Sequence, residues 1–181
     1  MSRFVFLDRD GTLVRDLGYT HRIEDYELLP GVVTGLRRIL DAGYRLAVIT
    51  NQSGIGRGYF RTEQYAAFQA HLAGDLARQG VPIEASYFCP HRPEAECQCR
   101  KPRPALLHRA ERELGADLAR SWVIGDSAVD VELAQRGGCR GAVRVLTGRD
   151  EPSGETTPGV HRAASFEEAA EIVLRADQRT P

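Results

Sequence analysis

The chain has 181 residues, of which 42% are hydrophobic and 27% are charged, a composition typical of one ordinary globular domain spanning residues 1–181. Its 24 basic and 25 acidic side chains give a net charge of −1, which excludes a broad field favouring nucleic acid or an anionic membrane surface. No apolar run approaches the ~20 residues that span a bilayer, and the N-terminus lacks a signal-peptide pattern. We therefore expect a cytoplasmic protein without a membrane or nucleic-acid partner.

Strand and helix patterns alternate along the chain. Short apolar runs predict strands over 4–7, 45–49, 85–88, 122–124 and 143–146. Helical periodicity and capping residues predict helices over 31–42, 62–79, 104–114, 129–136 and about 165–175, with a loop at 147–159. Thr62 is expected to cap the second helix, and Ser165 with Glu168 to form a capping box for the last. The alternation predicts an α/β fold, a Rossmann-like parallel sheet flanked by helices.

Two carboxylates stand where the first predicted strand ends, in the segment Asp-Arg-Asp-Gly-Thr at 8–12. In an extended chain residues i and i+2 point the same way, so Asp8 and Asp10 face one pocket, and Gly11 lets backbone amides approach an anion. Such a pair suits attack on phosphorus by one carboxylate and proton transfer by the other. A solvated turn is the alternative, because Asp and Gly are common turn residues.

Polar residues also follow the later predicted strands, namely Thr50, Lys101 and Asp126. Ligands of open parallel sheets bind at the carboxyl ends of the strands, so we expect these residues to share a crevice with Asp8 and Asp10. Carboxylates ~4 Å apart repel by ~4 kcal/mol at an effective dielectric of 20, so a cation is expected, and oxygen ligands favour Mg²⁺. Lys101 and the Thr50 hydroxyl are expected to hold phosphate oxygens.

A second cluster places three sulfurs and one imidazole in the loop at about 89–99. Its members are Cys89, His91, Cys97 and Cys99. These donors suit a tetrahedral Zn²⁺, and four protein ligands leave no open position, so the expected zinc is structural. Arg100 and Lys101 follow directly, so a clamped loop would aim two cations at the crevice. Incidental thiols beside a surface histidine are the alternative, and Cys139 is expected to be a small buried apolar residue.

The chain resembles phosphatases of the haloacid dehalogenase superfamily. The resemblance rests on residues 8–13, Thr50, Lys101, and residues 125–126 with Asp130, which are similar to the four motifs of that superfamily. It implies that Asp8 is the nucleophile and a Mg²⁺ ligand. It further implies that Asp10 is the acid/base and binds the metal through its backbone carbonyl, and that Asp126 is the remaining protein ligand. Asp130 would support the site, and Lys101 would neutralise charge on the transferred phosphoryl group.

The zinc loop followed by Arg-Lys-Pro narrows the resemblance to two families, the D-glycero-D-manno-heptose 1,7-bisphosphate 7-phosphatases and the histidinol-phosphate phosphatases. Residues 16–19 and 50–60 resemble substrate loops of the heptose family, whereas the five residues between His91 and Cys97 match the shorter loop of the histidinol-phosphate type. The heptose likeness implies substrate contacts from Asp16, Leu17, Gly18, Tyr19, Thr50, Asn51, Gln52, Ser53, Arg100 and Lys101. It implies hydrolysis of the 7-phosphate through an aspartyl-phosphate, in nucleotide-heptose and lipopolysaccharide core biosynthesis.

The sizeable connections are residues 14–30 and the zinc loop, so we expect no large cap domain and a monomer that acts on a small phosphorylated sugar. Histidinol-phosphate hydrolysis in histidine biosynthesis is the first alternative. A 3′-phosphatase acting on nucleic-acid ends is a second, which the near-neutral charge disfavours. A zinc-stabilised binding module without turnover is a third, which the intact Asp8 and Asp10 disfavour. The order of the strands is not predicted.

Overall fold

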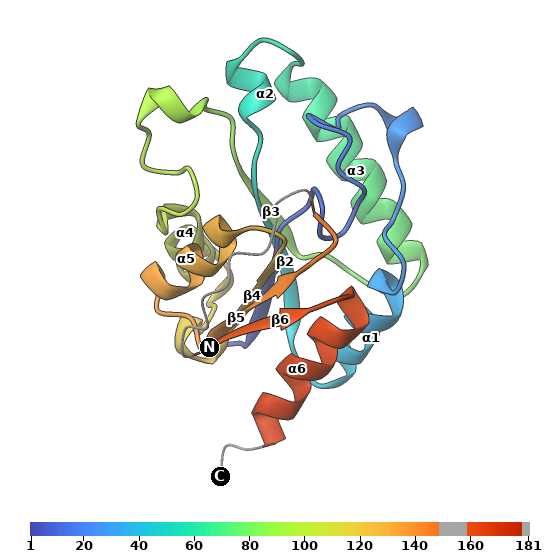
Figure 1. Ribbon diagram of the computed structural model, residues 1–181, viewed down its shortest axis with the longest axis vertical. Helices are drawn as coiled ribbons and strands as arrows, with labels where there is room; N and C mark the ends of the chain where they lie inside the picture. Colours follow the sequence, from blue (N-terminus) through green and yellow to red (C-terminus); the bar gives the residue numbers. More distant parts are fainter. Residues whose placement is uncertain (149–158, 179–181) are drawn as a thin grey trace.

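A parallel sheet of six strands lies at the centre of the computed structural model, which describes residues 1–148 and 159–178 (Figure 1). The strands are β1 (Phe4–Leu7), β2 (Arg45–Asn51), β3 (Ala85–Cys89), β4 (Trp122–Gly125), β5 (Gly141–Val145) and β6 (Val160–Ala163). Their order is β3-β2-β1-β4-β5-β6, and every neighbouring pair is parallel. The chain winds outward from β1 in both directions, which makes the carboxyl end of β1 the switch point where ligands bind in such sheets.

Helices cover both faces of the sheet (Figure 1). The helices are α1 (Val32–Asp41), α2 (Ser53–Gly56), α3 (Thr62–Arg78), α4 (Ala105–Leu114), α5 (Ala128–Arg136) and α6 (Phe166–Gln178), with short 3-10 turns η1 (Ile23–Asp25), η2 (Pro93–Ala95) and η3 (Leu118–Arg120). Residues of α1, α3 and α6 share one hydrophobic cluster with the sheet, and residues of α4 and α5 share another. The predicted α/β fold is therefore confirmed, and the described residues contain no cap domain.

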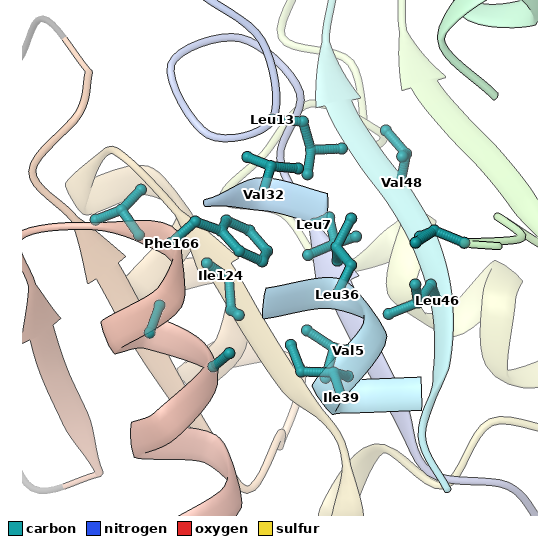
Figure 2. Close-up of a cluster of buried hydrophobic side chains, with 14 of the residues drawn as sticks. Val5, Leu7, Leu13, Val32, Leu36, Ile39, Leu46, Val48, Ile124 and Phe166 are labelled. Atoms are coloured by element: carbon teal, nitrogen blue, oxygen red, sulfur yellow. The ribbon is translucent and has the colours of Figure 1, made fainter. Parts of the chain in front are cut away.

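The central strand β1 explains both clusters. Its side chains alternate, so that Val5 and Leu7 pack on one face of the sheet and Phe4 and Phe6 on the other, and all four are fully buried. Figure 2 shows Val5 and Leu7 among apolar side chains of α1 and α6. A parallel strand covered on both faces reads as a continuous apolar run, which is why this strand is clear in the sequence.

Two elements differ from the prediction. Residues 53–56 form the short helix α2, inside the segment 50–60 that resembles a substrate loop. Strand β6 was not predicted, because His161 and Arg162 are exposed and the strand joins the sheet through backbone pairing with β5. Most of the predicted loop at 147–159 lies outside the described residues. Among the described residues, no helix is both long and apolar enough to cross a membrane.

The predicted helix caps are partly right. Thr62 is the first helical residue rather than the cap, and the Gln64 side chain accepts the backbone N–H of Arg61 at 2.9 Å. At the last helix the Ser165 hydroxyl accepts the N–H of Glu168 at 3.2 Å, as predicted. The Glu168 carboxylate reaches back one residue further than expected, to the N–H of Ala164 at 2.7 Å. A local side chain therefore accepts at least one backbone N–H at each of these two helix starts.

Candidate active site

Lys101, two residues after the cysteine loop at 89–99, meets residues of β2 and α5 and the carboxyl end of β1 at one edge of the sheet. Asp8 Oδ1 lies 2.7 Å from Lys101 Nζ, which lies 2.6 Å from Asp130 Oδ1. The same ammonium donates to the carbonyl of Ile49 at 2.9 Å, and Lys101 is only 4% exposed. Three oxygens from three parts of the chain thus fix this cation beside the predicted nucleophile.

Burial dominates the ionisation of this cluster. It raises the pKa of Asp8 to about 6, an effect that Lys101 opposes and Asp130 reinforces. It also raises the pKa of Asp126 to about 8, and the charges of Asp8 and Asp130 add to this effect. Burial alone would lower the pKa of Lys101, but the carboxylates of Asp130 and Asp8 raise it above its ordinary value. Three acids therefore share one ammonium, which leaves uncompensated negative charge for a further cation.

The acidic cluster fits a hard metal ion. Oxygens of Asp8, Asp126 and Asp130 lie within 4.8 Å of one another. Asp130 uses one oxygen for Lys101 and the other for the Ser127 hydroxyl at 2.6 Å, so Asp8 and Asp126 are better placed as direct ligands. An all-oxygen donor set suits Mg²⁺. The arrangement supports the predicted division between ligands and a supporting Asp130.

Glycines make room for these carboxylates. A methyl group added at Gly11 or Gly148 would overlap the Asp126 carboxylate, and Gly11 also has a φ of +76° that disfavours other residues. A methyl group at Gly125 would overlap the carboxyl group of Asp130. Gly11 and Gly125, which belong to the predicted motifs, are therefore glycines because a larger residue would collide with these carboxylates.

Asp10 lies at a pocket of about 320 Å³ beside this cluster. The residues lining it are Asp10, Asp16, Gly18, Tyr19, Asn51, Gln52 and Ser53. The structure thus brings most of the predicted substrate contacts to the predicted acid/base. Leu17 belongs to the same loop, but its side chain is about half exposed. The lining residues offer the carboxylates of Asp10 and Asp16 together with hydroxyl and amide groups, all of which can bond to the hydroxyl groups of a polyhydroxy ligand.

Two of these amides also bond to the predicted catalytic groups. Gln52 Nε2 donates to Asp10 Oδ2 at 2.9 Å and to the Thr50 hydroxyl oxygen at 3.0 Å, so the Thr50 proton stays available to a ligand. Asn51 Nδ2 donates to the carbonyl of Lys101 at 3.2 Å, and its Oδ1 accepts the N–H of Lys101 at 3.0 Å. Sequence reasoning expected sugar contacts here and missed these bonds, because they join residues far apart in the chain.

Arg100 has different contacts from its neighbour Lys101. Its guanidinium donates to the carbonyl of His91 at 3.3 Å. It lines a second pocket of about 300 Å³, together with Arg103 and Arg136. Its contact with substrate stays a prediction.

The cysteine loop brings its four donors together. Cys97 Sγ lies 3.5 Å from Cys89 Sγ and 3.6 Å from Cys99 Sγ, while His91 Nδ1 lies 3.6 Å from Cys89 Sγ and 3.3 Å from Cys99 Sγ. Zn–S bonds of about 2.3 Å and Zn–N bonds of about 2.0 Å predict tetrahedron edges of roughly 3.5–3.8 Å. The loop therefore fits a tetrahedral metal. Cys139, predicted to be a small buried residue, is only partly buried and packs against the cluster on the α4 and α5 face of the sheet. Burial raises the pKa of its thiol to about 12.

The cysteine loop also supports the pocket that Asp10 lines. The N–H of Gln52 donates to the carbonyl of Cys89 at 2.7 Å, and the N–H of Gly56 donates to the carbonyl of Pro90 at 2.8 Å. A methyl group at Gly56 would lie only 2.8 Å from the backbone of residues 90 and 92. Helix α2 therefore rests directly on the loop that leads to Lys101.

Comparison with known proteins agrees with this geometry. Residues 98–172 match the HAD-hydrolase-like family model. The D-glycero-beta-D-manno-heptose-1,7-bisphosphate 7-phosphatase of Yersinia pestis is 39% identical over 152 residues, covering 80% of this chain and 81% of that protein. The chain belongs to the heptose-1,7-bisphosphate 7-phosphatase family of HAD-like hydrolases.

Other members of this family extend the likeness. The probable D-glycero-D-manno-heptose-1,7-bisphosphate 7-phosphatase of Thermoplasma acidophilum is 44% identical over 132 residues, covering 72% of this chain and 82% of that protein. The crystal structure of the D,D-heptose 1,7-bisphosphate phosphatase from B. bronchiseptica, complexed with magnesium and phosphate, superposes with a TM-score of 0.87 at 30% identity. It covers 96% of this chain and 99% of that one. The superfamily resemblance and the Mg²⁺-dependent phosphatase class predicted from sequence are confirmed.

Proposed function

We propose that this protein hydrolyses the 7-phosphate of D-glycero-D-manno-heptose 1,7-bisphosphate, in nucleotide-heptose synthesis for the lipopolysaccharide core. The observation that carries the proposal is the buried Lys101 ammonium, 2.7 Å from Asp8. The backbone of Lys101 bonds to Asn51, which lines the same polar pocket as Asp10. The relatives named above, at 39% and 44% identity, carry this activity in their names.

In the first step the Asp8 carboxylate attacks phosphorus. An oxygen–phosphorus bond forms to Asp8, the bond between phosphorus and the C7 oxygen breaks, and Asp10 gives its proton to that oxygen. Lys101 neutralises charge next to Asp8, and the Thr50 hydroxyl is free to donate to a phosphate oxygen. Mg²⁺, when bound by Asp8, Asp126 and the backbone carbonyl of Asp10, supplies further charge neutralisation at the phosphate.

In the second step a water molecule attacks the phosphorus of the aspartyl-phosphate. Asp10, now ionised, accepts a proton from that water, the bond to Asp8 breaks, and orthophosphate leaves. Asp10 lies within reach of the pocket and is held in place by Gln52 at 2.9 Å. One carboxyl group therefore serves as acid and then as base, and both residues return to their starting state.

We further propose that Cys89, His91, Cys97 and Cys99 hold a structural Zn²⁺ in a single-domain, monomeric enzyme. Four protein donors close the coordination sphere, so the metal has no position for substrate. Its effect on activity is indirect, through Lys101 and through α2, which bonds to Pro90 by the N–H of Gly56. Light scattering on the purified protein tests the expected monomer.

A substrate comparison tests the proposed function. We expect kcat/KM for heptose 1,7-bisphosphate to exceed that for histidinol phosphate and for a 3′-phosphorylated oligonucleotide by on the order of 10²-fold or more. Phosphorus NMR of the product should show the anomeric phosphate retained. A higher kcat/KM for histidinol phosphate would move the assignment to histidine biosynthesis. Absence of turnover with every ester would favour a binding module instead.

A further inference from the structure

Arg9, between the two aspartates, has a fully buried side chain. Its relative exposure is 0%, and its guanidinium lies 4.7 Å from the ring centroid of Phe68 and 5.6 Å from that of Tyr65. Both rings belong to α3. A guanidinium gives up strong hydration when it is buried, so the site must return that energy through specific bonds.

Those bonds converge on Asp10. Arg9 Nη2 lies 2.8 Å from Asp10 Oδ1 and 2.9 Å from Oδ2, and Arg9 Nε lies 3.1 Å and 3.2 Å from the same two oxygens. The Asp10 side chain is 21% exposed, whereas that of Arg9 is 0% exposed. The carboxylate is thus held from its buried side and presents its other side to the pocket.

The same guanidinium reaches two further segments. Nη2 donates to the carbonyl of Thr20 at 2.5 Å, at the end of the loop that carries Asp16 and Tyr19, and to Gln52 Oε1 at 3.2 Å. The other end of the Gln52 amide donates to Asp10 at 2.9 Å. One buried cation therefore connects the predicted acid/base with both segments that line the substrate pocket.

We propose that Arg9 is a positioning residue, which fixes the Asp10 carboxylate toward the leaving oxygen and holds the 16–20 loop beside it. The proposal rests on the proposed role of Asp10. Proton transfer requires the acid within hydrogen-bond reach of the leaving atom, and an aspartate at a strand end has freely rotating side-chain torsions unless its oxygens are held. A bidentate arginine holds both carboxylate oxygens at once, which lysine cannot do.

A purely structural role for Arg9 makes a different prediction. Arg9 Nη1 is buried without a hydrogen-bond partner among the described residues. A side chain selected only to fill the space over Phe68 would not need a guanidinium with one unmatched nitrogen. If Arg9 only supported the fold, its loss would lower every kinetic step in proportion to the folded fraction.

The test compares Arg9→Met and Arg9→Lys with wild type on two substrates, heptose 1,7-bisphosphate and p-nitrophenyl phosphate. The p-nitrophenolate leaving group needs no proton, whereas the sugar alkoxide does. For Arg9→Met we expect kcat on the sugar to fall on the order of 10²-fold with little change in KM. With p-nitrophenyl phosphate, the rapid burst of p-nitrophenolate should persist while steady-state turnover slows, because only release of the phosphoryl group from Asp8 then needs Asp10.

Arg9→Lys keeps the positive charge but loses the bidentate guanidinium. Its kcat on heptose 1,7-bisphosphate should therefore lie between those of wild type and Arg9→Met, and it should show the same burst of p-nitrophenolate. If Arg9→Met does not fold, Arg9→Lys alone carries the test. Arg38→Met is the matched control, because that arginine is an exposed residue of α1 paired with Glu171 at 3.3 Å. Equal losses in the burst and the steady state, or unchanged kinetics in both variants, would overturn the proposal. Failure of wild type on the heptose substrate would refute the proposed substrate but leave the p-nitrophenyl phosphate comparison valid.

Discussion

Neutralising Asp126 should stabilise the magnesium-free protein while it abolishes activity. The folded protein keeps this carboxyl group partly buried next to Asp8 and Asp130, and burial and these neighbouring charges raise its pKa from 3.8 to about 8. In the unfolded chain the group ionises freely at neutral pH. Because the folded pKa is raised, the stability associated with this group is fully present below about pH 4 and is lost as the pH rises through about 8. Because the amide of Asp126→Asn does not ionise, the variant does not lose this stability as the pH rises.

The size of the effect follows from the shift. A rise of about four units at ~1.36 kcal/mol each sets an upper limit of roughly 5 kcal/mol near pH 8, and solvent at the pocket edge reduces it toward about 2 kcal/mol. For a chain of this length that corresponds to roughly 5–15 °C in Tm. Magnesium reverses the order of stability of the two proteins. At a hundredfold excess of Mg²⁺ over Kd the unfolding free energy of wild type rises by about 2.7 kcal/mol, whereas that of the variant rises little.

Calorimetry at pH 5 and pH 8 provides the assay. The proteins are dialysed into magnesium-free buffer without a chelator, so that the cysteine loop keeps its metal. We expect the Tm advantage of Asp126→Asn to be larger at pH 8 than at pH 5, and to reverse when Mg²⁺ is added. Asp41→Asn, an exposed aspartate at the end of α1, is the control and should change neither value. A variant less stable than wild type in magnesium-free buffer at pH 8 would refute the reasoning.

Further predictions concern the glycines and the cysteine loop. Gly125→Ala should displace Asp130 from Lys101 and reduce kcat on the order of 10²-fold, as measured by phosphate release; unchanged kcat would show that the contact is unimportant. Gly74 lies inside α3, and a methyl group added there would have its nearest side-chain neighbour at 3.6 Å. Gly74→Ala should therefore leave kcat unchanged and raise the unfolding free energy by about 0.5–1 kcal/mol in denaturant titrations. Chelation should release one zinc per chain, lower activity, and expose three thiols to a disulfide reagent. Burial opposes ionisation of Cys97, but hydrogen bonds with neighbouring thiols lower its pKa to about 7, so it should react first, while Cys139 stays slow before and after chelation.

The sequence was sufficient where local chemistry decides the structure. The apolar run of β1 and the helical periodicity of α1 depend on burial of their own side chains, so both were predicted close to their observed bounds. The clustering of Asp8 with Asp126 followed from the rule that parallel strands end at one edge. The cysteine loop was predictable because its four donors lie within eleven consecutive residues.

Features that depend on distant partners were not predictable. Strand β6 is held by backbone pairing with β5 rather than by an apolar pattern of its own. Arg9 lies between two acids in sequence and suggests a solvated turn, yet it is buried by rings of α3 and by Gln52, more than forty positions away. The pairing of Asn51 with the Lys101 peptide joins residues fifty positions apart. Tertiary contacts determine each of these three features, so no local sequence pattern predicts them.

Trapping the phosphoryl group on Asp8 tests the central claim most directly. Wild type mixed with heptose 1,7-bisphosphate and Mg²⁺ is quenched in acid within one turnover, digested, and analysed by mass spectrometry. Our account predicts one added phosphoryl group on the peptide that contains Asp8, and none in Asp8→Asn, whose amide is not a competent nucleophile. Rapid turnover by Asp8→Asn, or a phosphoryl group trapped on a different residue, would contradict it.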